Sequence, residues 1–344
     1  QLMMEDVKEG RFSPAVVYDG DTPAEYASVP LTCYEGKGYR RETFESISTL
    51  LENYYASRDT ITRIRQKSSD LRRIVQTALE RSCKKYDLQL KQLKDTEKRE
   101  KYRIYGELLN TYGYELKGGE KSFKCINYYD NEEITIPLDP QLTARENAQK
   151  HFDKYNKLKR TYEALSQLTM ETKAEVDHLE SVSSALDIAL EENDLVQIKE
   201  ELMEFGYVKK RRANEKRPKI TSKPFHYISS DGYDIFVGKN NYQNEELTFK
   251  VASGNDWWFH AKGIPGSHAI VKSNGQADLP DRVFEEAGAL AAYYSKGREN
   301  DKVEIDYIQK KNIKKVAGAA PGFVIYHTNY SLVASPRCDL KEVK

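Results

Sequence analysis

The residues best suited to recognise a ligand gather in three clusters in the last third of the chain. The first is the segment 238–244, GKNNYQN, where amide side chains follow a lysine. Amides donate and accept hydrogen bonds, so they can recognise ribose, base edges and phosphate. A polar turn with asparagine caps would have the same composition and is the structural alternative. The RNA-binding candidates in this cluster are Lys239, Asn240, Asn241, Gln243 and Asn244.

The second cluster is the segment 256–268, DWWFHAKGIPGSH. Strand alternation would put Trp257 and Phe259 on one face of the strand and Trp258 and His260 on the other. One aromatic pair can then fill the core while the other stacks on bases. The candidates are Trp258, His260, Lys262 and His268. The histidines could also form a metal site or an acid–base pair, but no third ligand has useful spacing, so we predict no metal and no catalytic residue.

The third cluster, 302–315, combines a strand pattern with a basic end. Apolar residues alternate with acids along VEIDYI, which is typical of a half-buried strand. The lysines that follow are candidates for RNA contact, or else a solvated edge that blocks aggregation. These candidates are Lys310, Lys311, Lys314 and Lys315. A separate basic run, Lys209, Lys210, Arg211 and Arg212, is interpreted as part of a linker that either contacts phosphate or is merely solvated.

The composition excludes several functional classes. No stretch approaches the roughly 18–20 apolar residues of a membrane-spanning helix, so no membrane partner is predicted. The four cysteines lie far apart without a CxxC pair, which favours reduced intracellular thiols over a disulfide framework or zinc site. The chain has no P-loop, GxGxxG, HExxH or nucleophile motif, so neither an enzyme nor a cofactor is predicted.

Charge is balanced overall but segregated along the chain. The 54 basic residues match 54 acidic ones. We interpret 171–204 as an acidic returning helix, whereas 58–73, 209–223 and 310–315 are basic. The zero net charge therefore argues against indiscriminate binding to nucleic acid and leaves specific binding to RNA open.

Two stretches with heptad spacing must position these clusters. Apolar residues step by 4-3-4-3 in the first stretch, at Leu79, Cys83, Tyr86, Leu90 and Leu93. The same alternation returns between Leu158 and Leu190, after a capping box formed by Thr143 and Glu146. Two short strands, 123–129 and 133–137, lie between the stretches. We therefore predict an antiparallel coiled-coil hairpin with a small β-tip near 112–138, rather than an ordinary helical bundle.

The last block, 225–336, is richer in glycine and aromatic residues. Short β runs occur at 233–237, 247–251, 257–259, 268–271, 302–308 and 323–326. An alanine-rich helix is expected over 281–295, and its small residues would let it lie close to a sheet. The fold class is therefore α and β, with the hairpin followed by a compact α/β domain that has a mixed sheet and one main helix. The predicted divisions are 1–40, 41–208, a linker at 209–224, 225–336 and a tail at 337–344.

Several long motifs give this chain a family resemblance. GKNNYQNEELT, DWWFHAKGIPGSH, AAYYSKGR and VEIDYIQKKNIKKVAGAAPG resemble the C-terminal domain of the NFACT proteins. YRIYGELL, IPLDP and ENAQ resemble that family's middle coiled-coil module. The resemblance runs from about residue 12 to residue 336. It implies that the chain is a C-terminal fragment lacking the family's N-terminal domain, with 1–40 as a remnant of the N-terminal or helix-hairpin-helix region.

The resemblance also implies a function. Family members bind large ribosomal subunits that still carry peptidyl-tRNA, and they recruit tRNA, alanyl-tRNA in bacteria, for C-terminal tailing of the stalled chain. The implied partners are ribosomal RNA, the stalk-base protein and tRNA, in the cytoplasm. The ribosome itself would form the peptide bonds. The alternatives are a surface adhesin that binds fibronectin, as an older family name suggests, and a nucleic-acid-modifying enzyme that uses His260 and His268.

Overall fold

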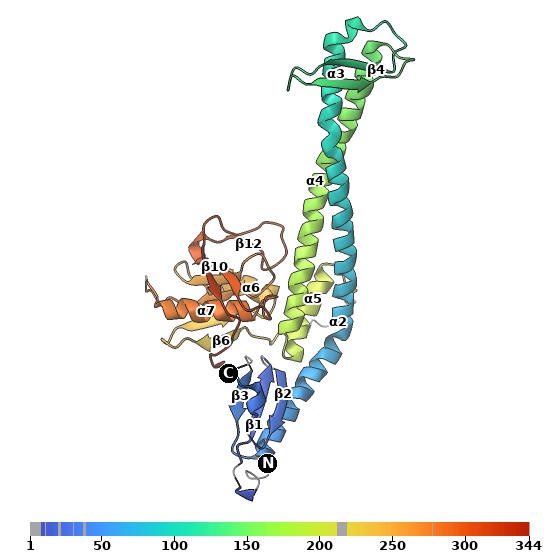
Figure 1. Ribbon diagram of the computed structural model, residues 1–344. Coiled ribbons are helices and arrows are strands. Elements are labelled where there is room, and N and C mark those ends of the chain that lie inside the picture. Colours follow the sequence, from blue (N-terminus) through green and yellow to red (C-terminus); the bar gives the residue numbers. More distant parts are fainter. Residues whose placement is uncertain are drawn as a thin grey trace. The chain divides into compact units, whose positions relative to one another are not determined.

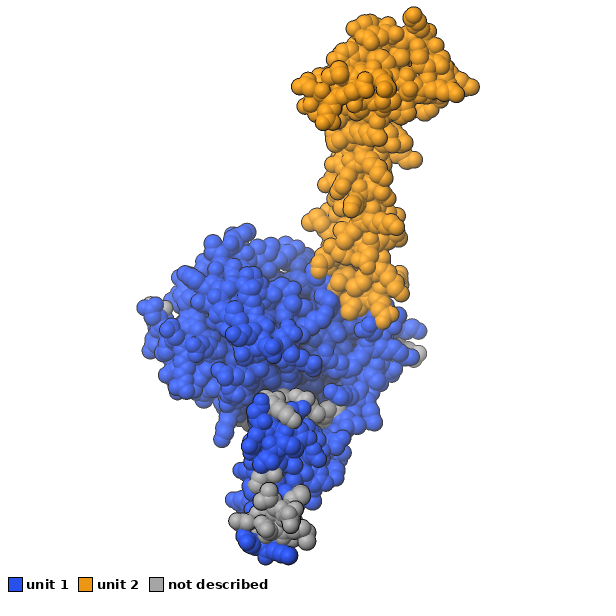
Figure 2. All heavy atoms as spheres, viewed as in Figure 1, with its two compact units in different colours: residues 1–78, 177–344 blue, residues 79–176 orange. Residues whose placement is uncertain are grey.

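A computed structural model describes residues 8–10, 12–19, 22–29, 31–36, 39–211, 219–276 and 278–343. The chain divides into two compact units (Figure 2). Unit 1 comprises residues 1–78 and 177–344, and unit 2 comprises residues 79–176. No helix within the described ranges has the length and apolar character needed to cross a membrane.

Unit 1 begins with a small antiparallel sheet that packs on a helix. Strands β1 (Ala15–Asp19), β2 (Thr22–Ala27) and β3 (Arg40–Thr43) are ordered β2-β1-β3. Val16 and Tyr18 of β1 pack against Leu50 and Tyr54, which lie in the first turns of α2 (Ile47–Asp95). The helix begins after Ser46, whose side chain accepts a hydrogen bond from the backbone of Thr49 at 3.1 Å.

Unit 2 contains the β-tip and the part of the predicted helical hairpin that carries it (Figure 1). The end of α2, η2 (Thr96–Lys98) and α3 (Arg99–Tyr112) lead through η3 (Gly113–Glu115) to β4 (Ser122–Ile126) and β5 (Glu133–Pro137), which pair antiparallel. The chain then returns along α4 (Ala144–Ile188). The Arg99 guanidinium lies 3.9 Å from the centre of the Tyr162 ring, so the two helical segments are in contact.

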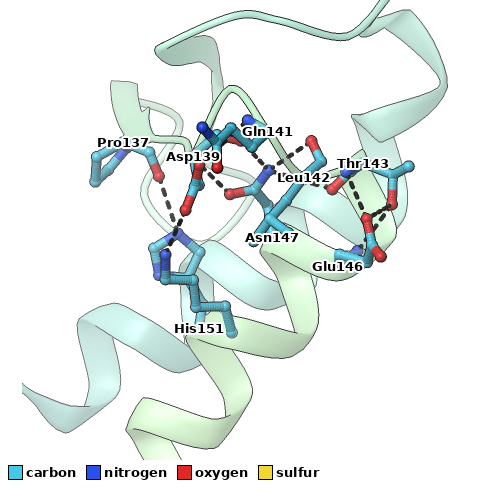
Figure 3. A network of polar contacts seen from close by, with 9 residues as sticks. Pro137, Asp139, Gln141, Leu142, Thr143, Glu146, Asn147 and His151 are labelled. Atoms are coloured by element: carbon cyan, nitrogen blue, oxygen red, sulfur yellow. Dashed lines mark hydrogen bonds and ion pairs between the residues drawn. The ribbon is translucent and has the colours of Figure 1, made fainter.

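The return into α4 is held by a local polar network (Figure 3). The predicted capping box is confirmed, because Thr143 donates its backbone N–H to Glu146 at 2.8 Å and Glu146 donates to the Thr143 hydroxyl at 3.3 Å. Asn147 accepts from the backbone N–H of Asp139 at 2.7 Å and donates to the Asp139 carbonyl at 3.0 Å. These contacts fix the path of the chain from β5 to α4.

The hairpin seam differs from the predicted one. Leu79, Tyr86 and Leu93 face inward to varying degrees, but the best-buried positions between them are Ser82 and Gln89. Leu90, which the 4-3 pattern placed in the seam, is 40% exposed. Successive helical residues are about 100° apart around the helix axis. Turning the helix by only about 45° therefore replaces Cys83 and Leu90 in the seam by Ser82 and Gln89, while Leu79 and Tyr86 stay close to it. The apolar pattern alone therefore could not predict which positions beside Leu79 and Tyr86 are buried in the seam.

A second correction concerns the acidic stretch 171–204. It is not one helix, because α4 ends at Ile188 and a separate helix, α5 (Glu192–Glu204), follows. A capping box formed by Glu191 and Asp194 begins α5. The break lets α5 fold back on the end of α4, where the His178 ring and the Glu201 carboxylate lie 2.8 Å apart.

The C-terminal part of unit 1 is built on a six-stranded sheet of order β13-β10-β8-β9-β7-β6. These strands are β6 (Phe225–Ile228), β7 (Asp234–Val237), β8 (Trp257–Ala261), β9 (Ala269–Val271), β10 (Val303–Gln309) and β13 (Tyr330–Ala334). Each pairing in this sheet is antiparallel, so the predicted mixed sheet is wrong. A parallel pair needs a long crossover connection, whereas antiparallel neighbours can be joined by short turns.

Helices cover both faces of this sheet. The predicted alanine-rich helix is α7 (Asp281–Tyr293), which lies beside the sheet (Figure 1). Its buried residues join the core under one face of the sheet. A Cβ atom on Gly288 would lie 2.7 Å from Leu332 of β13, so the helix approaches closely. On the other face lie α6 (Asn241–Glu246) and the π-helical turn η4 (Leu247–Val251).

Two predicted strands in this part also need correction. Residues 247–251 are helical, because the Asn240 side chain caps α6 by accepting from the Gln243 backbone at 3.1 Å and the helix continues through Leu247. The run at 323–326 forms only β12 (Val324–Ile325). It pairs with β11 (Lys314–Lys315) outside the six-stranded sheet. Short apolar runs do not distinguish a strand from a buried helical turn.

Candidate nucleic-acid interface

The amide cluster of 238–244 lies against α4 and α5 and is buried. Asn241 donates its side-chain amide to the Glu201 carboxylate at 2.7 Å and to the Ser181 hydroxyl at 2.8 Å. Asn240 donates to the Gln197 side chain at 2.8 Å. Lys239, Asn240, Asn241, Gln243 and Asn244 are all nearly inaccessible. In this conformation their hydrogen bonds serve the packing of the chain against these helices, which neither reading of the sequence expected; the asparagine cap of the structural alternative is present at Asn240.

Lys239, Gly238 and the backbone of His268 also take part in the packing of the amide cluster. The Lys239 ammonium lies 3.5 Å from the Asp194 carboxylate and 4.5 Å from the centre of the Phe225 ring. A Cβ atom on Gly238 would lie 2.2 Å from the Asn244 side-chain oxygen, so only glycine fits there. That oxygen accepts a hydrogen bond from the His268 backbone at 3.0 Å. The first and second clusters therefore form one packed structure.

The predicted alternation along β8 is confirmed. Trp257 and Phe259 contact Phe284 of α7, whereas Trp258 belongs to the core on the α6 side. Trp258 is 1% exposed, so neither face of its ring is free for a base. Trp257 is only half-buried. The more accessible tryptophan is thus Trp257, which was not among the RNA-binding candidates.

His260 and His268 lie together beside Trp258. Their ring centres are 5.4 Å apart, and the His268 Nδ1 atom is 2.7 Å from the Thr248 hydroxyl. Burial lowers the pKa of His260 to about 4 and the pKa of His268 well below its usual value, so both rings are neutral at pH 7. Among the described side chains, no group of three His, Cys, Asp or Glu residues is placed to hold a metal ion.

The lysine cluster provides the accessible charge. Lys311 and Lys314 are exposed and Lys310 is half-buried, and none of the three has an acidic partner within the described residues. Lys315 is paired with Glu245 at 2.7 Å, and Lys262 is paired with Glu304 at 2.5 Å. Lys310, Lys311 and Lys314 are therefore the candidates best placed to meet a phosphate.

The basic linker is placed only in part. Lys209 and Lys210 are exposed, and Arg211 is paired with Glu200 of α5. Arg212 lies outside the described residues, as do Lys216 and Arg217.

Other residues at this site were not singled out from the sequence. Tyr330 of β13 stacks on Tyr307 of β10, with ring centres 5.4 Å apart and planes 28° apart. Alternation along VEIDYI placed Tyr307 on the buried face and gave no sign of Tyr330. Asp194, Gln197 and Glu201, which are partners of the amide cluster, were also missed, because these contacts join residues 40 or more positions apart.

Comparison with known proteins identifies the family. The sequence model for NFACT N-terminal and middle domains matches residues 1–221, and that for the NFACT protein RNA binding domain matches residues 223–327. The chain belongs to the NFACT family, which confirms the resemblance. Since the first match includes the N-terminal domain in its description, the expectation that this domain is missing is not borne out.

Curated relatives carry the name Rqc2 homolog RqcH. That of Streptococcus suis is 42% identical over 326 residues, covering 94% of this chain and 57% of the relative. The relative of Bacillus subtilis is 35% identical over 338 residues, which cover 97% of this chain and 58% of the relative. This chain thus spans a little over half the length of these relatives. A solved structure, the C-terminal part of the fibronectin/fibrinogen-binding protein from Streptococcus suis, is 37% identical with a TM-score of 0.62, and covers 80% of this chain and 97% of that one.

Proposed function

We propose that the chain acts in ribosome-associated quality control, as a factor that binds large ribosomal subunits obstructed by peptidyl-tRNA. The observation that carries this proposal is the 35–42% identity to relatives named RqcH over 92–97% of the chain. The match to the RNA-binding domain over 223–327 supports an RNA partner. Lys310, Lys311 and Lys314, which have no acidic partner among the described residues, supply positive charge within that match.

The finer parts of the proposal concern partners and chemistry. The chain recruits tRNA, alanyl-tRNA in bacteria, for C-terminal tailing of the stalled chain, and it contacts ribosomal RNA and the stalk-base protein. The ribosome forms each peptide bond, so the chain contributes binding and is not itself an enzyme. It acts in the cytoplasm, where the stalled subunits are.

Co-sedimentation tests the proposal. The chain is mixed at physiological salt with large subunits that carry peptidyl-tRNA, and with empty subunits as the matched control. We expect the chain to pellet preferentially with the obstructed subunits and to be released as salt is raised, because phosphate contacts weaken with ionic strength. Failure to pellet with either preparation at physiological salt would overturn it.

A second candidate function is binding of fibronectin. The observation in its favour is the similarity to a solved structure whose title names a fibronectin/fibrinogen-binding protein. Surface-immobilised fibronectin would then capture the purified chain at sub-micromolar concentration, and competing RNA would not release it. Capture that RNA does displace would instead indicate non-specific charge attraction.

A further inference from the structure

A row of aromatic rings crosses the α7 face of the six-stranded sheet towards its β13 edge. We call it the aromatic edge and define it as Trp257, Phe284, Tyr307 and Tyr330. The centres of the Trp257 and Tyr307 rings are 5.8 Å apart, and those of Tyr307 and Tyr330 are 5.4 Å apart. Trp257 also meets Phe284 at 5.0 Å. The row leads outward from the core of α7 to the last strand of the sheet.

The outer end of this row is open. Tyr330 is 62% exposed, and Trp257, Phe284 and Tyr307 are half-buried. In the described part of the sheet, β13 pairs only with β10, so its other side is an edge. An exposed aromatic side chain that rests on a second ring is already oriented, which suits it to stacking on a flat ligand.

Positive charge lies at the end of the strand that carries Tyr307. Gln309 of β10 is opposite Trp257, and Lys310 and Lys311 follow directly. The backbone of Lys310 donates to the Asp256 carbonyl at 2.9 Å and that of Lys311 donates to the Gly254 carbonyl at 3.0 Å, so both residues are anchored. At about 3.3 Å per strand residue, Lys310 lies on the order of 10 Å from Tyr307 along the strand.

An acidic residue, Asp281, makes the charge on the two sides of the aromatic edge unequal. Burial, and then the charges of Tyr330 and Asp281, raise the pKa of Tyr307, and Asp281 stands three residues before Phe284 on α7. Asp281 lies at the start of α7. A phosphate backbone would therefore be repelled from the α7 side and attracted to the lysine side.

We propose that the aromatic edge is a base-stacking site for unpaired nucleotides, with Lys310 and Lys311 holding the adjoining phosphates. The inference rests on the proposed RNA-binding function and specifies its ligand as single-stranded. Stacking tolerates any base because every base presents a flat π-face, whereas a duplex hides its bases and offers only its backbone. A second protein strand added to β13 would be the competing occupant.

Anisotropy of a labelled twelve-nucleotide oligouridine, with an RNA duplex of the same length for comparison, tests the site in the full chain. Tyr330→Ala should weaken single-strand binding about tenfold, the usual scale for losing one stacked base, and leave duplex binding unchanged. Tyr330→Phe should retain binding, because it keeps the ring. Val333→Ala is the matched control, since Val333 is 64% exposed on the same strand but points to the opposite face.

The outcomes separate this inference from the proposed function. Equal affinity of wild type and Tyr330→Ala would overturn the stacking site, and a loss by Tyr330→Phe as large as that of Tyr330→Ala would also do so. If the wild type binds RNA and a Lys310→Glu/Lys311→Glu variant alone is weakened, RNA binding stands and stacking is wrong. If the wild type binds no RNA, the RNA-binding function itself fails. Self-association that Tyr330→Ala abolishes, with RNA binding unchanged, would identify the edge as a protein contact and overturn the proposal.

Discussion

The side-chain amide of Asn241 donates a hydrogen bond to the Glu201 carboxylate across 2.7 Å. The same carboxylate oxygen lies 2.8 Å from the His178 ring nitrogen, and Glu201 is fully buried. A residue of the C-terminal domain therefore helps to satisfy a carboxylate of α5, and α4 contributes the third group. This relationship makes the amide cluster a structural joint between the domain and the two helices.

Removing the Asn241 amide should destabilise this joint. Asn241→Ala leaves the Glu201 oxygen and the Ser181 hydroxyl each short of a donor, and an unmet buried polar group costs about 1–3 kcal/mol. We expect the free energy of unfolding in urea to fall by about that amount. Asn255→Ala is the control, because Asn255 is exposed in the same domain and should change stability by less than about 0.5 kcal/mol. Equal stability of the two variants would show that the contact contributes nothing.

Charge reversal of Lys310, Lys311 and Lys314 should weaken RNA binding. In the variant Lys310→Glu/Lys311→Glu/Lys314→Glu, each lost phosphate contact should make the slope of log affinity against log salt concentration less steep by about one. Affinity measured from 50 to 200 mM salt gives this slope. Lys315→Glu is the comparison, since Glu245 already holds Lys315 at 2.7 Å and its loss should matter less. A Lys315→Glu effect as large as that of the triple variant would contradict the assignment.

Replacing a polar seam residue should stabilise the hairpin. Gln89 is 7% exposed, and its side-chain oxygen has no hydrogen-bond partner among the residues that the structure describes. Gln89→Leu should therefore raise the free energy of unfolding by about 1–2 kcal/mol. Leu90→Gln alters a 40% exposed site and should be nearly neutral. Thermal unfolding followed by circular dichroism decides, because the seam predicted from the apolar pattern requires the opposite order of stability.

The two low-pKa histidines should make the C-terminal domain sensitive to acid. His260 is neutral in the folded chain down to about pH 4, whereas an unfolded histidine takes up a proton near pH 6.5. The unfolded state binds more protons in this window, so stability should fall as pH decreases from about 6.5 towards 4. Urea unfolding at several pH values measures the slope. His260→Gln should reduce the dependence of the unfolding free energy on pH, whereas His327→Gln, at an exposed site, should not. Equal slopes for the wild type and His260→Gln would show that His260 does not cause the effect.

Features with a local cause could be predicted from the sequence alone. The capping box needs only Thr143 and Glu146 three residues apart, and the heptad hairpin needs only the 3.5-residue apolar period. The same holds for the alternation of Trp257 and Trp258 on β8, because successive strand side chains point to opposite faces. The long motifs around these residues were sufficient for the family as well, which the comparisons confirm.

Only the tertiary structure decided which of these groups face a partner and which face water. Asn241 is buried because Glu201, 40 residues earlier, lies against it. Gln89 is buried and Leu90 is exposed, although the apolar pattern placed Leu90 in the seam. Tyr330 meets Tyr307 because β13 pairs with β10. Each outcome depends on a neighbour that is distant in sequence, whereas composition and spacing report only on residues within a few turns or strand positions.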